Sequence, residues 1–225
     1  EILKIIHKIS KNDALYFIVR TIQIILTKLI RIDRKYYEEI FELSKLFCSL
    51  KLFPNSDVSH LAAGPFRDMF TVAVILKEFD WAENFVKEQS QFLSEDIREN
   101  ELNFCMGNLS FKRGKYEKSL EFFNKVEMID IIEKINIRFY YMMNYIELKS
   151  YESALSSLNT IRQFYHDRKD EIPEMFAVLI PDALKYFNEI IKCEEQGIKL
   201  DEMLYKEAKD GRRYYHVKYV LDKME

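Results

Sequence analysis

Apolar residues recur at helical spacing along almost the whole chain. Between residues 34 and 52 they fall three and four positions apart and form one stripe: Tyr37, Ile40, Phe41, Leu43, Leu46, Phe47 and Leu50. Such a stripe is typical of an amphipathic helix that buries one face. Asp13 is a candidate N-cap for a preceding helix that runs to about Ile32, and Asp33 is a candidate N-cap for the striped helix. The pattern therefore predicts an all-α fold.

Glycine and proline are rare, and this supports the helical prediction. The 225 residues include five Gly and four Pro, whereas sandwiches, barrels and dinucleotide-binding sheets need such turn residues at frequent intervals. Pro54 predicts a loop, Gly64-Pro65 predicts a helix start with Pro65 in its first turn, and Gly197 predicts a helix end.

An aromatic residue recurs with a fixed period in the middle of the chain. Trp81, Tyr116 and Tyr151 are separated by 35 residues in both steps, and each follows a polar or small residue at a predicted turn. A period near 35 residues indicates an array of paired helices, of about a dozen residues each. The spacing predicts that each aromatic residue begins the second helix of a hairpin. One hairpin cannot bury its apolar faces alone, so stacked hairpins would share one core.

The middle copy, residues 103–126, resembles a tetratricopeptide repeat (TPR). The resemblance rests on small residues and aromatic residues at the positions that the family pattern requires: Gly107, Gly114, Tyr116, Ser119 and Phe123. The next copy keeps Tyr151 and Ala154 but has Met142 and Lys149 where the pattern has glycine. The preceding copy keeps Trp81 but has Asn84 and Glu88 at the small and aromatic positions.

The resemblance implies a right-handed α-solenoid of antiparallel helix hairpins with atypical terminal helices. We expect a single helical-repeat domain over residues 1–225. Within it, residues 1–64 form N-terminal helices, residues 65–168 form three TPR-like repeats, and residues 169–225 form C-terminal capping helices.

The resemblance also implies a peptide-binding surface, because the first helices of TPR hairpins form a concave wall that holds peptides. The positions of that wall supply the candidate contacts Met69, Lys77, Phe104, Asn108, Phe111, Lys112, Phe139 and Met143. The TPR subclass that clamps a terminal carboxylate has basic residues where this chain has Met69, Phe104 and Phe139, so that clamp is not expected. Phe104 and Phe139 fit either an apolar groove or the core between repeats.

No motif for catalysis, metal binding or cofactor binding was recognised. Nucleotide-binding glycine motifs and zinc-protease or serine-hydrolase signatures do not occur, and the four histidines are scattered. The leading hypothesis is therefore a non-catalytic scaffold that binds a protein or peptide in the concave groove. One alternative is a sensor or regulatory domain of a larger protein. Another is a helical enzyme whose site combines distant acids and histidines.

The charge and cysteine content restrict partners and compartment. The net charge of −3 gives no basic field for nucleic acid, and the basic aromatic segment 211–219 fits a capping helix better. The apolar segment 14–32 is interrupted by charges, so no membrane span is expected. Three widely spaced cysteines favour reduced thiols in a cytoplasmic compartment.

Overall fold

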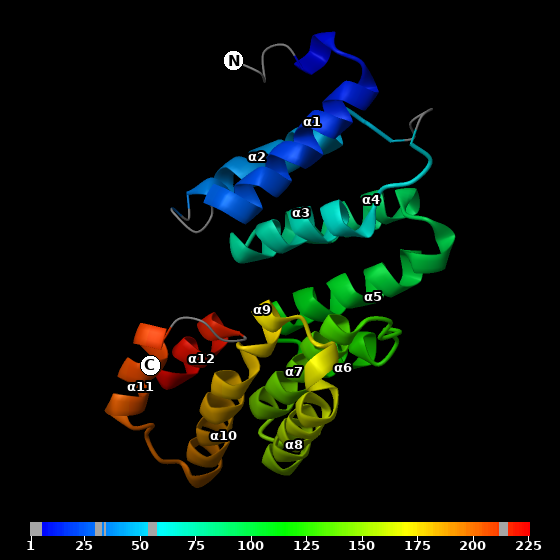
Figure 1. Cartoon of the computed structure of the whole chain (residues 1–225). Helices are drawn as coiled ribbons and strands as arrows, with labels where there is room; N and C mark the ends of the chain where they lie inside the picture. Colours follow the sequence, from blue (N-terminus) through cyan, green and yellow to red (C-terminus); the bar gives the residue numbers. More distant parts are fainter. Residues whose placement is uncertain (1–5, 30–32, 34, 54–57, 212–215) are drawn as a thin grey trace. The chain divides into compact units, whose positions relative to one another are not determined.

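The fold is helical throughout the part of the chain that is described. A computed structural model describes residues 6–29, 33, 35–53, 58–211 and 216–225, and all regular secondary structure in these ranges is helical (Figure 1). This confirms the all-α prediction. The chain divides into two compact units, residues 1–113 and 114–225. Each unit buries its own set of apolar side chains.

The first unit begins with a pair of helices, α1 (Lys11–Ile24) and α2 (Tyr36–Ser49). Ser10, rather than Asp13, caps α1: its side chain accepts a hydrogen bond from the Asp13 amide at 3.1 Å. A π-helical turn, Ile25–Leu29, extends α1. Residues 30–32 and 34, where the sequence places the junction between the two helices, lie outside the described ranges.

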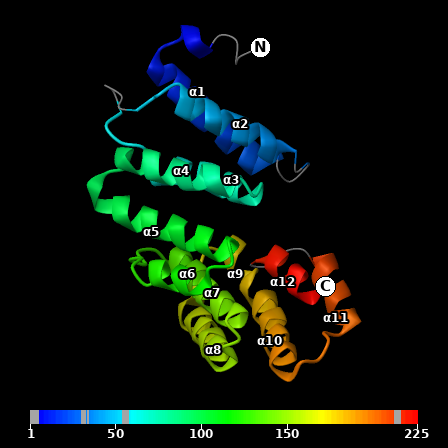
Figure 2. The ribbon, with the colours of Figure 1, turned by 180° about the vertical axis from the view of Figure 1, so that it is seen from behind.

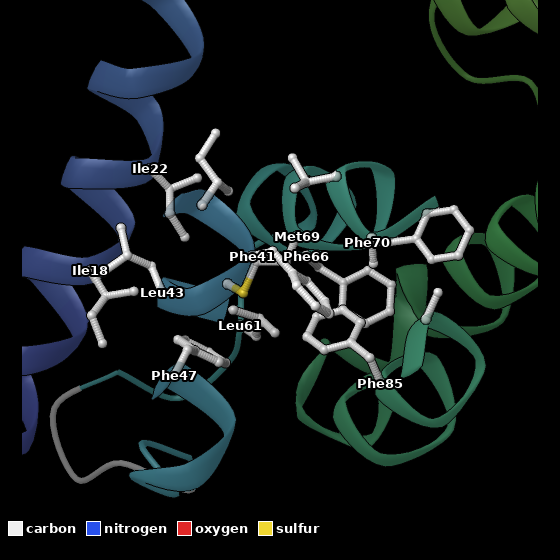
Figure 3. Packing of buried hydrophobic residues seen from close by; sticks show 14 of the residues in the cluster. Ile18, Ile22, Phe41, Leu43, Phe47, Leu61, Phe66, Met69, Phe70 and Phe85 are labelled. Carbon is white, nitrogen blue, oxygen red and sulfur yellow. The ribbon is translucent and has the colours of Figure 1, made fainter. Parts of the chain in front are cut away.

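Three more helices complete the first unit: α3 (Ala63–Ile75), α4 (Phe79–Gln89) and α5 (Glu95–Lys112). Pro65 lies in the first turn of α3, as predicted. Helix α3 packs against α2, α4 and α5. Figure 3 shows the resulting core, in which isoleucines of α1 face aromatic and aliphatic side chains of α2 to α4. Burial of each such side chain contributes about 1.5–3 kcal/mol.

Three helix-connecting turns share one backbone conformation. The second turn residue is left-handed in each, with φ of 64° at Lys77, 71° at Gly114 and 57° at Lys149. In the first and third turns the next amide bonds back to the preceding helix, from Glu78 to Ala73 and from Ser150 to Tyr145, both at 2.9 Å. This is the six-to-one bond of a Schellman C-cap.

The turns confirm two of the three predicted helix starts. Helices α6 (Tyr116–Phe123) and α8 (Tyr151–Arg168) begin at the expected tyrosines. Helix α4 begins at Phe79, two residues before Trp81, so the prediction for Trp81 was wrong. The helix starts two residues after the left-handed residue, Lys77, as α6 and α8 start two residues after Gly114 and Lys149. The positions of aromatic residues in the sequence do not by themselves distinguish a start at Phe79 from one at Trp81. Trp81 is half-buried and packs against the core, 5.0 Å from Phe41 between ring centroids.

The second unit combines the α7/α8 hairpin with C-terminal helices. After α6 come α7 (Ile131–Glu147), α8, the short α9 (Glu174–Ala177), α10 (Ile180–Gln196), α11 (Glu202–Gly211) and α12 (Val217–Met224). Helix α7 packs against α6 and α8, α10 packs against α8, and α12 packs against α10 and α11 (Figure 2). Gly197 ends α10 in the left-handed conformation, as predicted.

Helix α12 is fixed to two neighbours by ion pairs. The Lys223 ammonium lies 3.1 Å from a carboxylate oxygen of Glu147 on α7 and 3.1 Å from one of Glu194 on α10. The C-terminal segment therefore covers part of this unit. Residues 212–215, which include most of the basic part of segment 211–219, lie outside the described ranges.

Two further observations concern the environment of the chain. Within the ranges that the structure describes, no helix is long and apolar enough to cross a membrane. Cys48, Cys105 and Cys193 are free thiols. Burial raises the pKa of the Cys48 thiol to about 12, which makes it a poor nucleophile at neutral pH.

Candidate peptide-binding site

The predicted wall residues of the first unit differ in accessibility. Met69 is fully buried and points into the core beside Phe66 (Figure 3), and Phe111 is also buried. Phe104 and Asn108 are half-buried, whereas Lys77 and Lys112 are exposed. The side chains of Met69 and Phe111 therefore present almost no surface to a ligand.

The predicted wall residues of the second unit, Phe139 and Met143, are core residues. Their exposed fractions are 0% and 1%. The Phe139 ring lies 5.6 Å from the ring of Phe187 on α10 and 5.3 Å from the ring of His216, which precedes α12. For Phe139 the structure thus favours core over groove. A peptide would reach either side chain only after the covering helices moved.

Phe104 belongs to an ion-pair cluster between α3 and α5. The Arg67 guanidinium stacks on the Phe104 ring, 4.5 Å from its centroid. Arg67 also donates two hydrogen bonds to the Glu101 carboxylate, from Nε at 2.5 Å and from Nη2 at 2.7 Å. The Glu101 side chain is 5% exposed and that of Arg67 is 29% exposed. This bidentate pair is a structural contact that joins the two helices.

A polar pocket lies among α6, α7 and α8 in the second unit. Its cavity volume is about 210 Å³, and its lining residues are Asn124, Arg138, Tyr141, Tyr145, Ser157 and Thr160. Arg138, Tyr141 and Tyr145 are spaced by three and four residues and so share one face of α7. That face is not the face of Phe139 and Met143, because adjacent helical residues diverge by about 100°.

Arg138 is the charged group of this pocket. Its guanidinium carbon lies 4.3 Å from the centroid of the Phe164 ring on α8, and Nη1 donates to the Lys134 carbonyl at 2.9 Å. Within the described ranges no carboxylate forms an ion pair with Arg138. Burial lowers its pKa, but a guanidinium remains protonated at neutral pH. A half-buried positive charge is therefore held without a carboxylate partner from the described part of the chain.

The other lining groups are hydroxyls and an amide. The Tyr141 hydroxyl donates to Oδ1 of Asn124 at 2.8 Å, and Thr160 donates to the Ser156 carbonyl at 2.9 Å. Burial raises the pKa of Tyr141, the nearby Tyr145 raises it further, and Arg138 opposes the shift. The three groups are therefore close enough to interact. Because its pKa is raised, the Tyr141 phenol remains protonated at neutral pH and acts as a hydrogen-bond donor.

The residues of this pocket were not among the predicted contacts, because those contacts were placed on the wall positions of TPR hairpins. A signal was present in the sequence: an arginine and two tyrosines at positions 138, 141 and 145, which lie on one face of a helix. Identification of a pocket, however, required the contribution of α8, whose packing against α7 the sequence alone does not fix.

Metal-ligand clusters and carboxylates with shifted pKa values would be signs of a second site elsewhere in the described ranges. No cluster of three or more His, Cys, Asp or Glu residues there could hold a metal ion. Hydrogen bonds from Lys87 and Arg113 lower the pKa of Glu83 to about 2, so this carboxylate is a fixed ion-pair partner. Burial raises the pKa of Asp68, which lies on α3 and not in the pocket described above.

Comparisons of the chain with models of protein families, with curated proteins and with solved structures gave no match.

Proposed function

We propose that this chain is a non-catalytic protein- or peptide-binding module built from TPR-like helix hairpins stacked as a solenoid. The repeated turn supports the proposal, because Lys77, Gly114 and Lys149 adopt the same left-handed conformation between consecutive helices. The second and third turns also keep the 35-residue period of the sequence. Both features are those of an array made from one repeated unit.

The polar pocket of the second unit is the proposed binding site, and its composition is the observation on which this assignment rests. Arg138, Tyr141 and Tyr145 converge in an open depression. Arginine and tyrosine are enriched at protein interfaces and dominate their binding energy. The volume of about 210 Å³ is below the roughly 300–1,000 Å³ typical of small-molecule sites. It therefore fits one side chain of a peptide better than a metabolite.

Four of the predicted wall residues in the first unit remain candidates for additional contacts. Lys77, Phe104, Asn108 and Lys112 each retain exposed surface. Phe104 already stacks with Arg67, so a peptide would have to pack against the edge of that stacked pair. The cytoplasmic location stays part of the proposal, because the three thiols are free.

A peptide-display selection tests the proposed site. Random peptides would be selected on the intact chain, and the enriched sequences would be measured against Tyr141→Ala and Tyr145→Ala variants by calorimetry. We expect each substitution to weaken binding about tenfold or more, because interface tyrosines often contribute over 1 kcal/mol. Tyr165→Ala, on α8 but outside the pocket lining, is the matched control.

A folding control distinguishes a loss of binding at the pocket from a loss of the folded structure. Circular dichroism would first show that each variant is folded. Unchanged affinity in both folded pocket variants would exclude the pocket as the peptide site. If no sequence were enriched on the intact chain, the proposed function itself would be contradicted.

A further inference from the structure

We propose that the pocket formed by Asn124, Arg138, Tyr145 and Ser157 binds a carboxylate of the partner peptide. This inference rests on the proposed function and specifies the chemical group that the pocket recognises. The carboxylate could belong to an Asp or Glu side chain or to the end of the peptide chain. Both sources present the same pair of acceptor oxygens.

One edge of the Arg138 guanidinium has no hydrogen-bond partner among the described residues. Nη1 already donates to the Lys134 carbonyl, whereas Nε and Nη2 make no hydrogen bond within the described ranges. These two nitrogens form one side of the planar guanidinium. That side matches the two oxygens of a carboxylate and can donate two parallel hydrogen bonds to it.

The neighbouring lining groups can add donors. In the part of the chain that is described, the hydroxyls of Tyr145 and Ser157 make no hydrogen bond. Oδ1 of Asn124 accepts a hydrogen bond from the Tyr141 hydroxyl. The NH₂ group of Asn124 can therefore donate to a ligand. None of the six described lining residues is acidic. A ligand that only accepts hydrogen bonds, as an ionised carboxylate does, therefore satisfies these groups.

Charge favours a carboxylate over a phosphate. Arg138 is the single charged residue among the six described lining residues. One guanidinium neutralises one carboxylate, whereas a phosphate monoester carries about −1.5 to −2 charges at neutral pH. A phosphate would thus leave excess negative charge in a half-buried site.

The guanidinium is held in place before a ligand arrives. Phe164 contacts one face of it and the Lys134 carbonyl binds one end. These contacts reduce the conformational entropy that binding would otherwise remove. Folding has already removed much of the water around this half-buried charge. Ligand binding therefore carries a smaller desolvation penalty for the guanidinium.

Small carboxylates test the inference directly by NMR. The ¹⁵N-labelled chain would be titrated with N-acetyl-glutamate amide, which has a side-chain carboxylate, and with N-acetyl-glycine, which has a terminal one. N-acetyl-glutamine amide is the neutral analogue, and inorganic phosphate is the competing anion. The readouts are the Arg138 Nε–H resonance and the backbone amides of Tyr145 and Ser157.

We expect at least one carboxylate probe to shift these resonances saturably, with little effect from the neutral analogue. Hydrogen bonds to a charged group predict a loss of affinity of about 10- to 100-fold in Arg138→Gln. The control Arg162→Gln removes the same charge from α8. Arg162 is exposed and bonds to Asn159. The Arg162→Gln variant should bind the carboxylate probes with the same affinity as the unaltered chain.

Three results would overturn the inference: no saturable shift with either carboxylate, unchanged binding in Arg138→Gln, or tighter binding of phosphate. The two carboxylate probes identify the source of the group. Peptide binding through Tyr141 without any carboxylate effect would refute the inference and leave the proposed function intact. Carboxylate binding by a chain that selects no peptide would refute the proposed function instead.

Discussion

The hairpins α3/α4 and α7/α8 have several features in common. Each turns through a lysine in the left-handed conformation, Lys77 or Lys149. Each carries an arginine on its first helix, Arg67 or Arg138, whose guanidinium stacks on an aromatic ring at 4.5 or 4.3 Å. The two hairpins differ in whether a carboxylate forms an ion pair with the arginine. Glu101 binds Arg67 through two hydrogen bonds, whereas no carboxylate within the described ranges binds Arg138.

This difference separates a structural arginine from a recognition arginine. The charge of Arg67 is used within the fold, since Glu101 is almost fully buried and needs a cation. The charge of Arg138 has no such role, yet the fold keeps it half-buried and oriented. The same residue type with the same aromatic support can therefore stabilise one hairpin and leave the other able to bind a ligand.

Removal of Arg67 should have the largest effect on stability. Arg67→Leu leaves the Glu101 carboxylate buried without its cation, which costs about 3 kcal/mol of unfolding free energy. Urea unfolding followed by circular dichroism would measure it. The double variant Arg67→Leu/Glu101→Leu removes both charges and should recover much of the loss. If the single variant were as stable as the original chain, the distinction between the two arginines would not hold.

Acid should weaken a second paired arginine in the first unit. Lys87 and Arg113 lower the pKa of Glu83 from 4.5 to about 2, so the folded state favours the ionised carboxylate. The resulting stability is present above about pH 4.5 and is lost as the pH falls towards 2. We expect about 1 kcal/mol, since the partners are partly solvated. Urea unfolding from pH 6 to pH 2 would measure this loss, and Glu83→Gln should remove this part of the pH dependence.

Glycine should stabilise both lysine turns. Lys77→Gly and Lys149→Gly remove the strain of a left-handed lysine, which is partly offset by the greater freedom of glycine in the unfolded chain. The expected gain is roughly 0.5 to 1 kcal/mol for each, measured by thermal or urea unfolding. Gly114→Lys should lose a similar amount. Unequal gains at the two lysines would show that the turns are not energetically equivalent.

The sequence predicted the helices and two of the three turns because local chemistry determines them. Pro65 fixes its own φ angle in the first turn of a helix, and Gly197 adopts the left-handed conformation without strain. Tyr116 and Tyr151 follow a strict period. The predicted start of α4 was wrong because Lys77 adopts the left-handed conformation, which a lysine in the sequence does not indicate. Nor could the sequence show that other helices cover Phe139, or that no carboxylate of the described residues pairs with Arg138. Both depend on contacts between helices that are distant in the sequence.

Replacement of Arg138 by leucine should have the smallest effect on stability. Arg138→Leu is the same substitution as Arg67→Leu, but it leaves no buried acid unpaired. The loss of stacking on Phe164 and of one bond to the Lys134 carbonyl is offset by removal of a desolvated charge.

The expected change in unfolding free energy is within about 0.5 kcal/mol of zero, measured by the same urea titration. A loss close to that of Arg67→Leu would mean that Arg138 stabilises the folded chain through a contact of its own. In that case the pocket would be part of the structural framework, and a ligand would not be needed to explain why an arginine stands there.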